Sequence, residues 1–152
     1  MSDQNIEILK KETYLKAIDN SVGTKLFSSL FVRYKDTGEI KDVLDNGEYS
    51  CAFFVSGLLS LLQIIDKPVA TVESLKKMIQ SNEKWKTVSV VDIENGDVIF
   101  WNKIKFDDGS ENAHAGFVLN KDEAISTSYK TKSVVRHSSK DREIDCVYRY
   151  IW

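Results

Sequence analysis

Apolar positions follow two different periods along the chain. Before about Lys84 they recur mostly at helical spacing, and after it they mostly alternate with polar residues in the period of a β-strand. Helices followed by strands are typical of an α+β domain whose antiparallel sheet is segregated from its helices. We therefore predict a single α+β domain over residues 1–152, with a helical or irregular lead-in over 1–48 and a core over 49–152.

The lead-in contains one clear helical pattern and one ambiguous segment. A moderately amphipathic helix is predicted over Ile6 to about Asn20, with Ser2 or Asp3 as its N-cap. Apolar residues over 26–31 recur at helical spacing and favour another short helix. The overlapping segment 31–41 also fits a hairpin around a glycine-containing turn, so both alternatives remain open.

The predicted core begins with a helix that is apolar on almost every side. It runs from Cys51 to about Ile65 and follows Ser50, a residue type that commonly caps helix N-termini. A helix of this kind must be covered on most sides, so we place it at the centre of the domain. Thr71 then caps a further helix, and one face of that helix carries three regularly spaced residues: Val72, Leu75 and Ile79.

Short strands with turn residues between them fill the second half of the chain. They are expected to form an antiparallel sheet that covers one face of the central helix. The predicted strands are Thr87–Val91, Asp97–Trp101, Ala113–Leu119, Glu123–Ser128, a weaker Ser133–His137, and Ile144–Trp152.

Composition and charge exclude several classes of protein. The chain has 21 Lys plus Arg against 23 Asp plus Glu, which gives a net charge of −2. Because the positive and negative charges nearly cancel, the chain lacks the excess of basic residues typical of nucleic-acid or anionic-membrane binding. Neither partner is expected. The longest apolar stretch is too short and too often interrupted by polar residues to span a bilayer.

No cofactor or metal is expected either. Two cysteines, Cys51 and Cys146, are too few for a thiolate metal site or a disulfide scaffold. The acidic residues Asp107, Asp108 and Glu111 lack the spacing of a Ca²⁺ loop, and no phosphate-binding or dinucleotide glycine motif occurs. The first residues lack the basic and apolar regions of a signal peptide. A cytoplasmic location is therefore the default, and export by a route without a signal peptide stays open.

Cys51 is the first candidate for chemistry, because it occupies the first turn of the predicted central helix. Unpaired N–H groups and the helix dipole favour a thiolate there, and the same N–H groups are suited to hold an oxyanion. Free cysteine is also common in protein interiors. Taken alone, Cys51 is more simply explained as a small apolar core residue.

His114 favours a catalytic role for Cys51, because it places an ionisable ring in an apolar strand. Period-2 alternation puts it on the same face as Gly116, which would leave an open notch for a substrate backbone beside the imidazole. A cysteine at a helix start and a histidine on a later strand form the nucleophile–base pair of acyl transfer. The other histidine, His137, is interpreted as a surface residue in an exposed loop, and Cys146 as an ordinary strand residue.

Three segments resemble the NlpC/P60 family of papain-like cysteine peptidases. CAFFVSGL at 51–58 resembles the family's nucleophile segment. NGDVIFW at 95–101, followed by HAGFVL at 114–119, resembles its glycine–aspartate strand and its histidine strand. The related CHAP amidases share this order and fit nearly as well. The resemblance covers about residues 49–136 and implies a papain-like fold, with the central helix packed on an antiparallel sheet.

The resemblance implies Cys51 as nucleophile and His114 as general base. It also implies a third polar residue on the next strand, usually His, Asn or Gln, that orients the imidazole. The matching position is Ser126. Serine is shorter and carries no charge, so slow catalysis or a bridging water is expected. The neighbours of Cys51 also depart from the family pattern, with Ser50 in place of Asp and Ala52 in place of a small polar residue.

These residues predict a cysteine-dependent amide hydrolase that works through an acyl-enzyme. By resemblance, the substrate is a peptidoglycan stem peptide or another short peptide-like amide. An acyl transferase that uses the same thioester is a variant of this prediction. The alternative is a catalytically weak or inactive papain-like domain that serves as a binding module. It is favoured by Ser126 and by the absence of an evident export signal, since a cytosolic protein has no access to cell-wall polymer.

Overall fold

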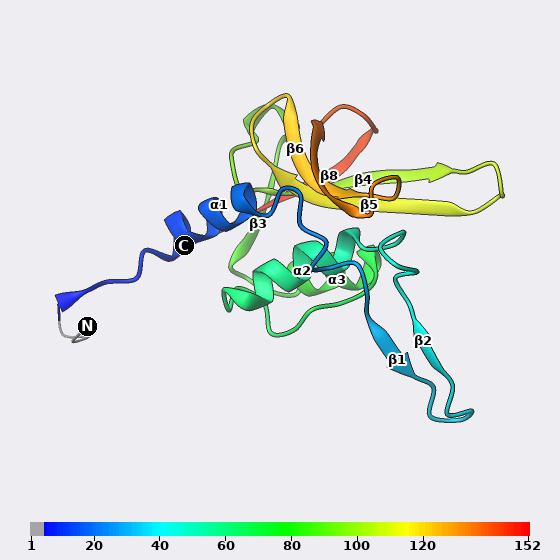
Figure 1. Cartoon of the computed structure of the whole chain (residues 1–152). Helices are drawn as coiled ribbons and strands as arrows, with labels where there is room; N and C mark the ends of the chain where they lie inside the picture. Colours follow the sequence, from blue (N-terminus) through cyan, green and yellow to red (C-terminus); the bar gives the residue numbers. More distant parts are fainter. Residues whose placement is uncertain (1–4) are drawn as a thin grey trace.

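The computed structural model describes residues 5–152 and has an α+β architecture. Three α-helices and two antiparallel sheets make up the described part of the chain (Figure 1). The larger sheet has six strands in the order β3-β8-β4-β5-β6-β7, and every neighbouring pair is antiparallel. Its strands are β3 (Trp85–Val88), β4 (Val98–Lys105), β5 (Glu111–Val118), β6 (Glu123–Ser128), β7 (Ser133–Ser138) and β8 (Ile144–Tyr150).

The first helix is shorter than its sequence pattern predicts. Helix α1 covers Lys10–Asn20, and the predicted first turn from Ile6 is not helical. Ile6 and Ile8 are 55% and 76% exposed, so no apolar surface packs against them to stabilise another turn. Leu9 occupies the N-cap position without a side-chain hydrogen bond. The predicted caps, residues 2 and 3, lie outside the described residues.

The ambiguous segment forms a hairpin and not a helix. Strand β1 (Phe31–Arg33) pairs with β2 (Ile40–Asp42), and the hairpin projects from the rest of the molecule (Figure 1). The Tyr34 amide donates to the Glu39 carbonyl, which closes the loop. Gly38 in that loop has φ +75°, a conformation that favours glycine. The turn chemistry therefore decides between the two alternatives.

The central helix begins where the sequence predicts and ends earlier. Helix α2 covers Cys51–Leu61 and buries seven of its eleven residues. Gln63 follows it with φ 57°, a left-handed conformation that ends the helical path before Ile65. Ser50 sits at the N-cap position, but its hydroxyl donates to the Gly47 carbonyl and does not cap the helix. The helix start is held by packing and not by a serine cap.

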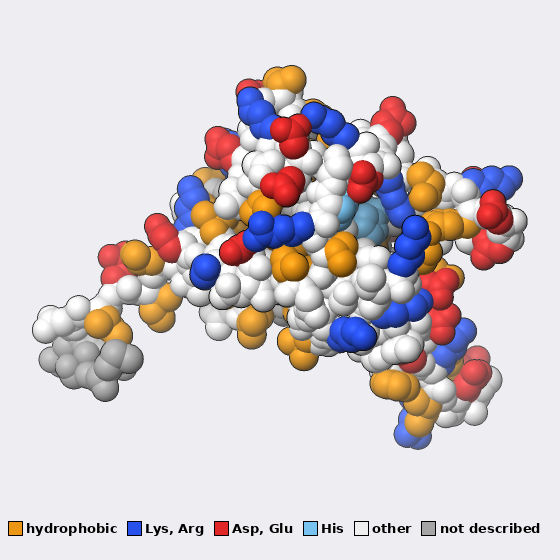
Figure 2. Space-filling view, turned by 45° about the horizontal axis from the view of Figure 1, so that its top comes forward, with side chains coloured by type: hydrophobic (Ala, Val, Ile, Leu, Met, Phe, Trp, Pro, Cys, Tyr) orange, Lys and Arg blue, Asp and Glu red, His pale blue; other side chains and the backbone are white. Residues whose placement is uncertain are grey.

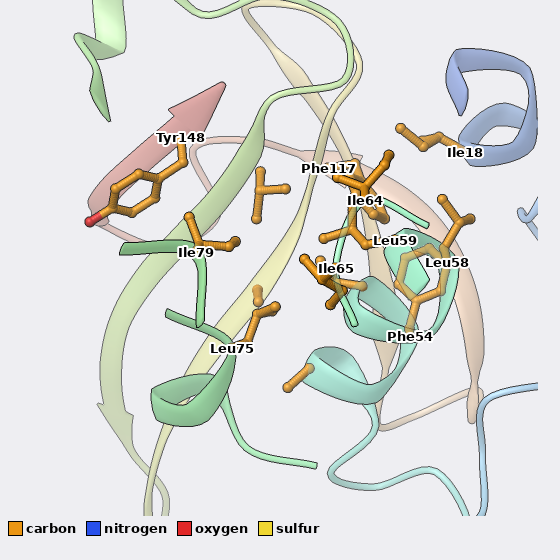
Figure 3. Close-up of a cluster of buried hydrophobic side chains, with 14 of the residues drawn as sticks. Ile18, Phe54, Leu58, Leu59, Ile64, Ile65, Leu75, Ile79, Phe117 and Tyr148 are labelled. Atoms are coloured by element: carbon orange, nitrogen blue, oxygen red, sulfur yellow. The ribbon is translucent and has the colours of Figure 1, made fainter. Parts of the chain in front are cut away.

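Helices α2 and α3 lie together on one face of the large sheet (Figure 1). Helix α3 covers Val72–Gln80, and the Thr71 hydroxyl accepts a hydrogen bond from the Ser74 amide, as the capping prediction requires. The main hydrophobic core fills the space between these helices and the sheet (Figure 3). Its large buried side chains include Phe54, Leu59, Leu75, Ile79 and Phe117.

Strand alternation sorts the sheet into two faces. Val98 and Phe100 of β4 belong to the core on the helix side, whereas Ile99 and Trp101 belong to a second buried cluster. The strand boundaries differ most from prediction at β3 and β4. Strand β3 begins at Trp85 and ends at Val88, because Val90–Asp92 forms a short 3₁₀ helix, and β4 continues past Trp101 to Lys105. Among residues 5–152, no helix has the length and apolar character needed to cross a membrane.

Candidate active site

A pocket of about 670 Å³ opens where the start of α2 meets strands β4 to β7. Its lining includes Cys51, His114 and Ser126, the three residues that the sequence singles out. Figure 2 shows histidine surface on this face of the molecule, close to Lys and Arg side chains. The fold thus gathers the three predicted residues from α2, β5 and β6 around one cavity.

Cys51 is the first residue of α2 and is 9% exposed. Burial raises the pKa of its thiol above the ordinary value, although hydrogen bonds from the backbone of Ala115 and Ala52 and the charge of Arg142 act in the opposite direction. The predicted low-pKa thiolate is therefore wrong for the free protein. Desolvation of the sulfur outweighs the stabilising groups at the helix start. The resting side chain is a neutral thiol.

His114 lies on β5, directly before Ala115, whose backbone contacts the Cys51 sulfur. Its Nε2 atom is 2.7 Å from Ser126 Oγ. Burial, together with the charges of Arg142 and His137, lowers the pKa of His114 to about 3. The imidazole is therefore neutral near pH 7 and able to accept a proton. Within residues 5–152 it makes no hydrogen bond to Cys51 Sγ, so the two groups share a pocket without being joined in the resting structure.

His137 is not the loose surface residue that its polar neighbours suggest. It lies on β7 with its side chain 19% exposed, and its Nε2 atom is 2.7 Å from Ser126 Oγ. Its Nδ1 atom is 2.9 Å from the Ser138 carbonyl and 3.2 Å from Asp141 Oδ2. Ser126 therefore bridges two histidines. It contacts His114 directly, so the water expected to extend its reach is not needed.

Trp101 lies on strand β4 and restrains the imidazole rings of both histidines. Its ring centroid lies 5.3 Å from that of His114 and 5.4 Å from that of His137. The indole is 1% exposed, and its N–H donates to the Ser139 carbonyl at 2.8 Å. A buried and hydrogen-bonded indole has little freedom to rotate. It therefore limits the rotation of the two histidine rings that pack on it.

The predicted open notch at Gly116 does not exist. A Cβ atom on Gly116 would lie 2.6 Å from the Ile125 carbonyl oxygen and 2.9 Å from Ser126 Cβ. The space beside this glycine is filled by β6 and by Trp101. The absence of a side chain therefore admits the neighbouring strand, which brings Ser126 to His114, and does not admit a substrate.

Arg142 is a half-buried cation in the same pocket. It lies between β7 and β8, and its Nη1 atom donates to the Asn112 carbonyl at 3.2 Å. It forms no ion pair with any residue from 5 to 152. Its charge lowers the pKa of both Cys51 and His114. The same guanidinium therefore favours a thiolate and disfavours an imidazolium.

The remaining candidates have structural roles. Asp97, in the segment compared with the family's glycine–aspartate strand, is a buried residue paired with Arg149 by contacts of 2.7 and 2.8 Å. Cys146 is a half-buried residue of β8, as its strand pattern predicts. In the described part of the chain, no group of three or more His, Cys, Asp and Glu side chains is arranged to hold a metal ion.

Sequence reasoning missed His137, Asp141 and Arg142. A signal for His137 was present in the hairpin that joins β6 and β7. The observed register pairs Ser126 with Val135, which makes His137 the diagonal neighbour of Ser126 on the same face. Arg142 lies in a turn, where no periodicity indicates the direction of a side chain.

Comparison of the sequence with protein-family models and with curated proteins finds no match.

Proposed function

We propose that this protein is a cysteine-dependent amide hydrolase with a papain-like arrangement of helix and sheet. The observation that carries the proposal is the shared pocket. Cys51 at the start of a buried helix and His114 on a facing strand line one cavity, and the far nitrogen of His114 is hydrogen-bonded to Ser126. These residues supply the nucleophile, the base and the orienting group that acyl transfer from an amide uses, which supports the proposal.

In the first half-reaction, Nδ1 of His114 takes the proton of the Cys51 thiol as sulfur attacks the amide carbon. Backbone N–H groups at the start of α2 stabilise the oxyanion. His114 then returns the proton to the leaving amine, and a thioester remains on Cys51. In the second half-reaction, His114 deprotonates a water that attacks the thioester. The products are a carboxylic acid and the free thiol.

The pKa directions require the proton transfer to be coupled to substrate binding. In the free protein Cys51 has a raised pKa and His114 a lowered one, so an ion pair between them is disfavoured. General-base catalysis avoids a free ion pair, because the proton moves while the sulfur–carbon bond forms. The contact between Cys51 and His114 must also tighten in the substrate complex, which is common in enzymes of this kind.

The substrate class we propose is a peptide-like amide, with peptidoglycan stem peptides as the first candidates by the resemblance to NlpC/P60 and CHAP enzymes. The pocket offers both aromatic and charged side chains to such a ligand. These are Tyr49, Phe106 and Tyr129 among the aromatic residues, and Lys103, Glu111 and Arg142 among the charged ones.

The test uses peptidoglycan fragments and a set of short peptide amides as probes, with new amine and carboxylate ends detected by mass spectrometry. We expect cleavage by the wild type and by Cys146→Ala, and none by Cys51→Ala. A covalent adduct on Cys51 during turnover would support the thioester. Equal cleavage by wild type and Cys51→Ala would overturn the proposal. Equal loss of cleavage in both cysteine variants would show that Cys51 is not the specific nucleophile.

The second candidate is a binding module with weak or no catalysis. It is favoured by the raised pKa of Cys51 and by the lack of a hydrogen bond between Cys51 and His114 among the described residues. This candidate predicts that wild type and Cys51→Ala bind the same peptidoglycan fragment equally and that neither cleaves it. Calorimetric titration of both proteins with that fragment separates the two candidates.

A further inference from the structure

The hydroxyl of Ser126 lies at the centre of a short chain of hydrogen bonds. Its oxygen is 2.7 Å from His114 Nε2 on one side and 2.7 Å from His137 Nε2 on the other. Ser126 is 1% exposed, so its hydroxyl is shielded from water. A serine has one hydroxyl hydrogen and two acceptor lone pairs. It can therefore donate to only one of the two imidazoles.

The surroundings of His137 decide which imidazole receives that hydrogen. Its Nδ1 atom faces two acceptors, the Ser138 carbonyl at 2.9 Å and Asp141 Oδ2 at 3.2 Å. Nδ1 must therefore carry a hydrogen, and a ring with a single hydrogen then has its acceptor at Nε2. Ser126 donates its hydrogen to that Nε2 atom. The oxygen of Ser126 is then left to accept from His114.

It follows that His114 carries its hydrogen on Nε2 and has a lone pair on Nδ1. Nε2 is held by Ser126, and no hydrogen bond within residues 5–152 uses Nδ1. Nδ1 is thus the nitrogen available to a thiol or a substrate in the pocket. A general base needs its lone pair at this position, and the opposite tautomer would present an N–H group there.

We propose that His137, oriented by Asp141, is a positioning residue that sets the tautomer of His114 through the hydroxyl of Ser126. This inference rests on the proposed function, since it assigns a role within the same site. A serine alone is an ambiguous partner, because it donates and accepts equally well. His137 removes that ambiguity by taking the hydroxyl hydrogen. The pair of Ser126 and His137 thereby does the work of the single orienting side chain that the family pattern implies.

The first test measures the tautomer directly and needs no substrate. The chain has two histidines, so ¹⁵N NMR of the labelled protein should show two imidazole rings, and the His137→Gln variant identifies that of His114. Near neutral pH we expect a protonated Nε2 and an unprotonated Nδ1 on His114. In His137→Leu the hydroxyl hydrogen turns to His114, so the tautomer with hydrogen on Nδ1 should gain population.

Matched variants separate this role from a purely structural one. The amide oxygen of Gln in His137→Gln can still accept from Ser126, so this variant should keep the wild-type tautomer. His137→Asn retains a polar side chain that is too short to reach Ser126, so it should show the same change of His114 tautomer as His137→Leu. It is the second variant in case His137→Leu folds poorly. An unchanged His114 tautomer in a folded His137→Asn protein, or a hydrogen on Nδ1 in the wild type, would overturn the inference.

The second test uses whichever probe the wild type cleaves. We expect His137→Leu to lower kcat by about tenfold or more, because loss of the group that fixes the tautomer of a catalytic histidine is costly. His137→Gln should recover most of that loss. In a Ser126→Ala background, His137→Leu should have no further effect, because the link between the rings is already broken. Additive losses would contradict the chain of hydrogen bonds.

The two tests fail independently of the proposed function. If Cys51 proves unnecessary for cleavage, the NMR experiment still reports whether His137 sets the tautomer of His114. If the tautomer does not respond to His137 while cleavage still requires Cys51, the hydrolase proposal stands and the positioning role of His137 is wrong.

Discussion

Gly116 and Ser126 are in direct contact across strands β5 and β6. A Cβ atom on Gly116 would lie 2.9 Å from Ser126 Cβ, closer than real Cβ atoms approach. It would also lie 2.6 Å from the Ile125 carbonyl oxygen, which belongs to the backbone and cannot easily move away. The hydrogen bond between Ser126 and His114 therefore depends on a position that has no side chain.

We predict that Gly116→Ala displaces Ser126 from His114 and destabilises the fold. Overpacking of this kind costs about 1–3 kcal/mol in the free energy of unfolding, measurable in urea. Cleavage should fall as well, because His114 loses its orienting partner.

Gly38→Ala is the matched control for this variant. Gly38 lies in the β1–β2 loop with φ +75° and with nothing within 4 Å of its added Cβ atom. Its substitution costs about 1–2 kcal/mol through backbone strain alone. It should therefore lower stability and leave cleavage intact. A Gly116→Ala protein with wild-type cleavage would contradict the prediction.

A second prediction concerns the buried ion pair that joins β4 to β8. The Asp97 side chain is 2% exposed and accepts from Arg149 Nε and Nη2 and from the Glu94 amide. Asp97→Ala should lower the free energy of unfolding by about 3 kcal/mol, because it removes the buried partner of the Arg149 guanidinium and leaves the Glu94 amide without its acceptor. Arg149 keeps its contacts with Glu94 and the Asp92 carbonyl.

The control for Asp97→Ala is Asp122→Ala, which removes an ion pair with Lys140 in which both side chains are more than 70% exposed. We expect a loss of less than about 1 kcal/mol there. Equal losses in urea unfolding would show that the Asp97 pair has no special weight.

The sequence predicts the fold best where packing and local pattern agree. The apolar character of Cys51–Leu61 indicates a central helix, and the alternation in Glu123–Ser128 predicts β6 at its observed bounds. Prediction is poorer where tertiary contacts decide the outcome. The first turn from Ile6 has a helical pattern but finds no surface to pack on, and Ser50 turns its hydroxyl to Gly47.

The candidate site also combines residues that the sequence predicts with properties that depend on the whole fold. Cys51 and His114 can be found from their places on a helix and a strand, and Ser126 from the position that the resemblance to NlpC/P60 enzymes implies. The pKa of Cys51 cannot, because desolvation depends on how deeply the whole fold buries the sulfur. The link to His137 depends on the register of the β6–β7 hairpin, and Arg142 reaches the pocket from a turn. The first relation can be read only once the register of the hairpin is known, and the second is not expressed in the local pattern of residues.

A third prediction follows from the lowered pKa of His114. The imidazole of His114 has a pKa near 6.5 in the unfolded chain and about 3 in the folded protein. Between these values the unfolded chain binds a proton that the folded protein does not. Stability should therefore fall as pH falls through this window, by at most about 1.4 kcal/mol per pH unit from this group.

His114→Gln isolates this contribution, because the carboxylates that also titrate are common to both proteins. The difference in unfolding free energy between wild type and variant should shrink or reverse as the pH is lowered from neutral toward 4. Parallel pH profiles in urea unfolding would show that the folded pKa of His114 is close to its ordinary value.

The last prediction concerns Arg142 and the thiol of Cys51. The half-buried guanidinium stabilises the thiolate, and so its removal in Arg142→Gln should raise the pKa of Cys51 further. The measurement is the rate of iodoacetamide alkylation against pH, in a Cys146→Ala background so that only Cys51 reacts. At a fixed pH below the pKa, alkylation should be slower in Arg142→Gln than in the parent protein, because the thiolate is the reacting form. Lys103→Gln serves as the control, since Lys103 is an exposed cation of the same pocket that does not contribute to the pKa shift of Cys51.

Arg142 also lowers the pKa of His114, so its removal should raise the pKa values of Cys51 and His114 together and leave their order unchanged. An alkylation profile of Arg142→Gln that stays in place or moves to lower pH would show that Arg142 does not act on the Cys51 sulfur.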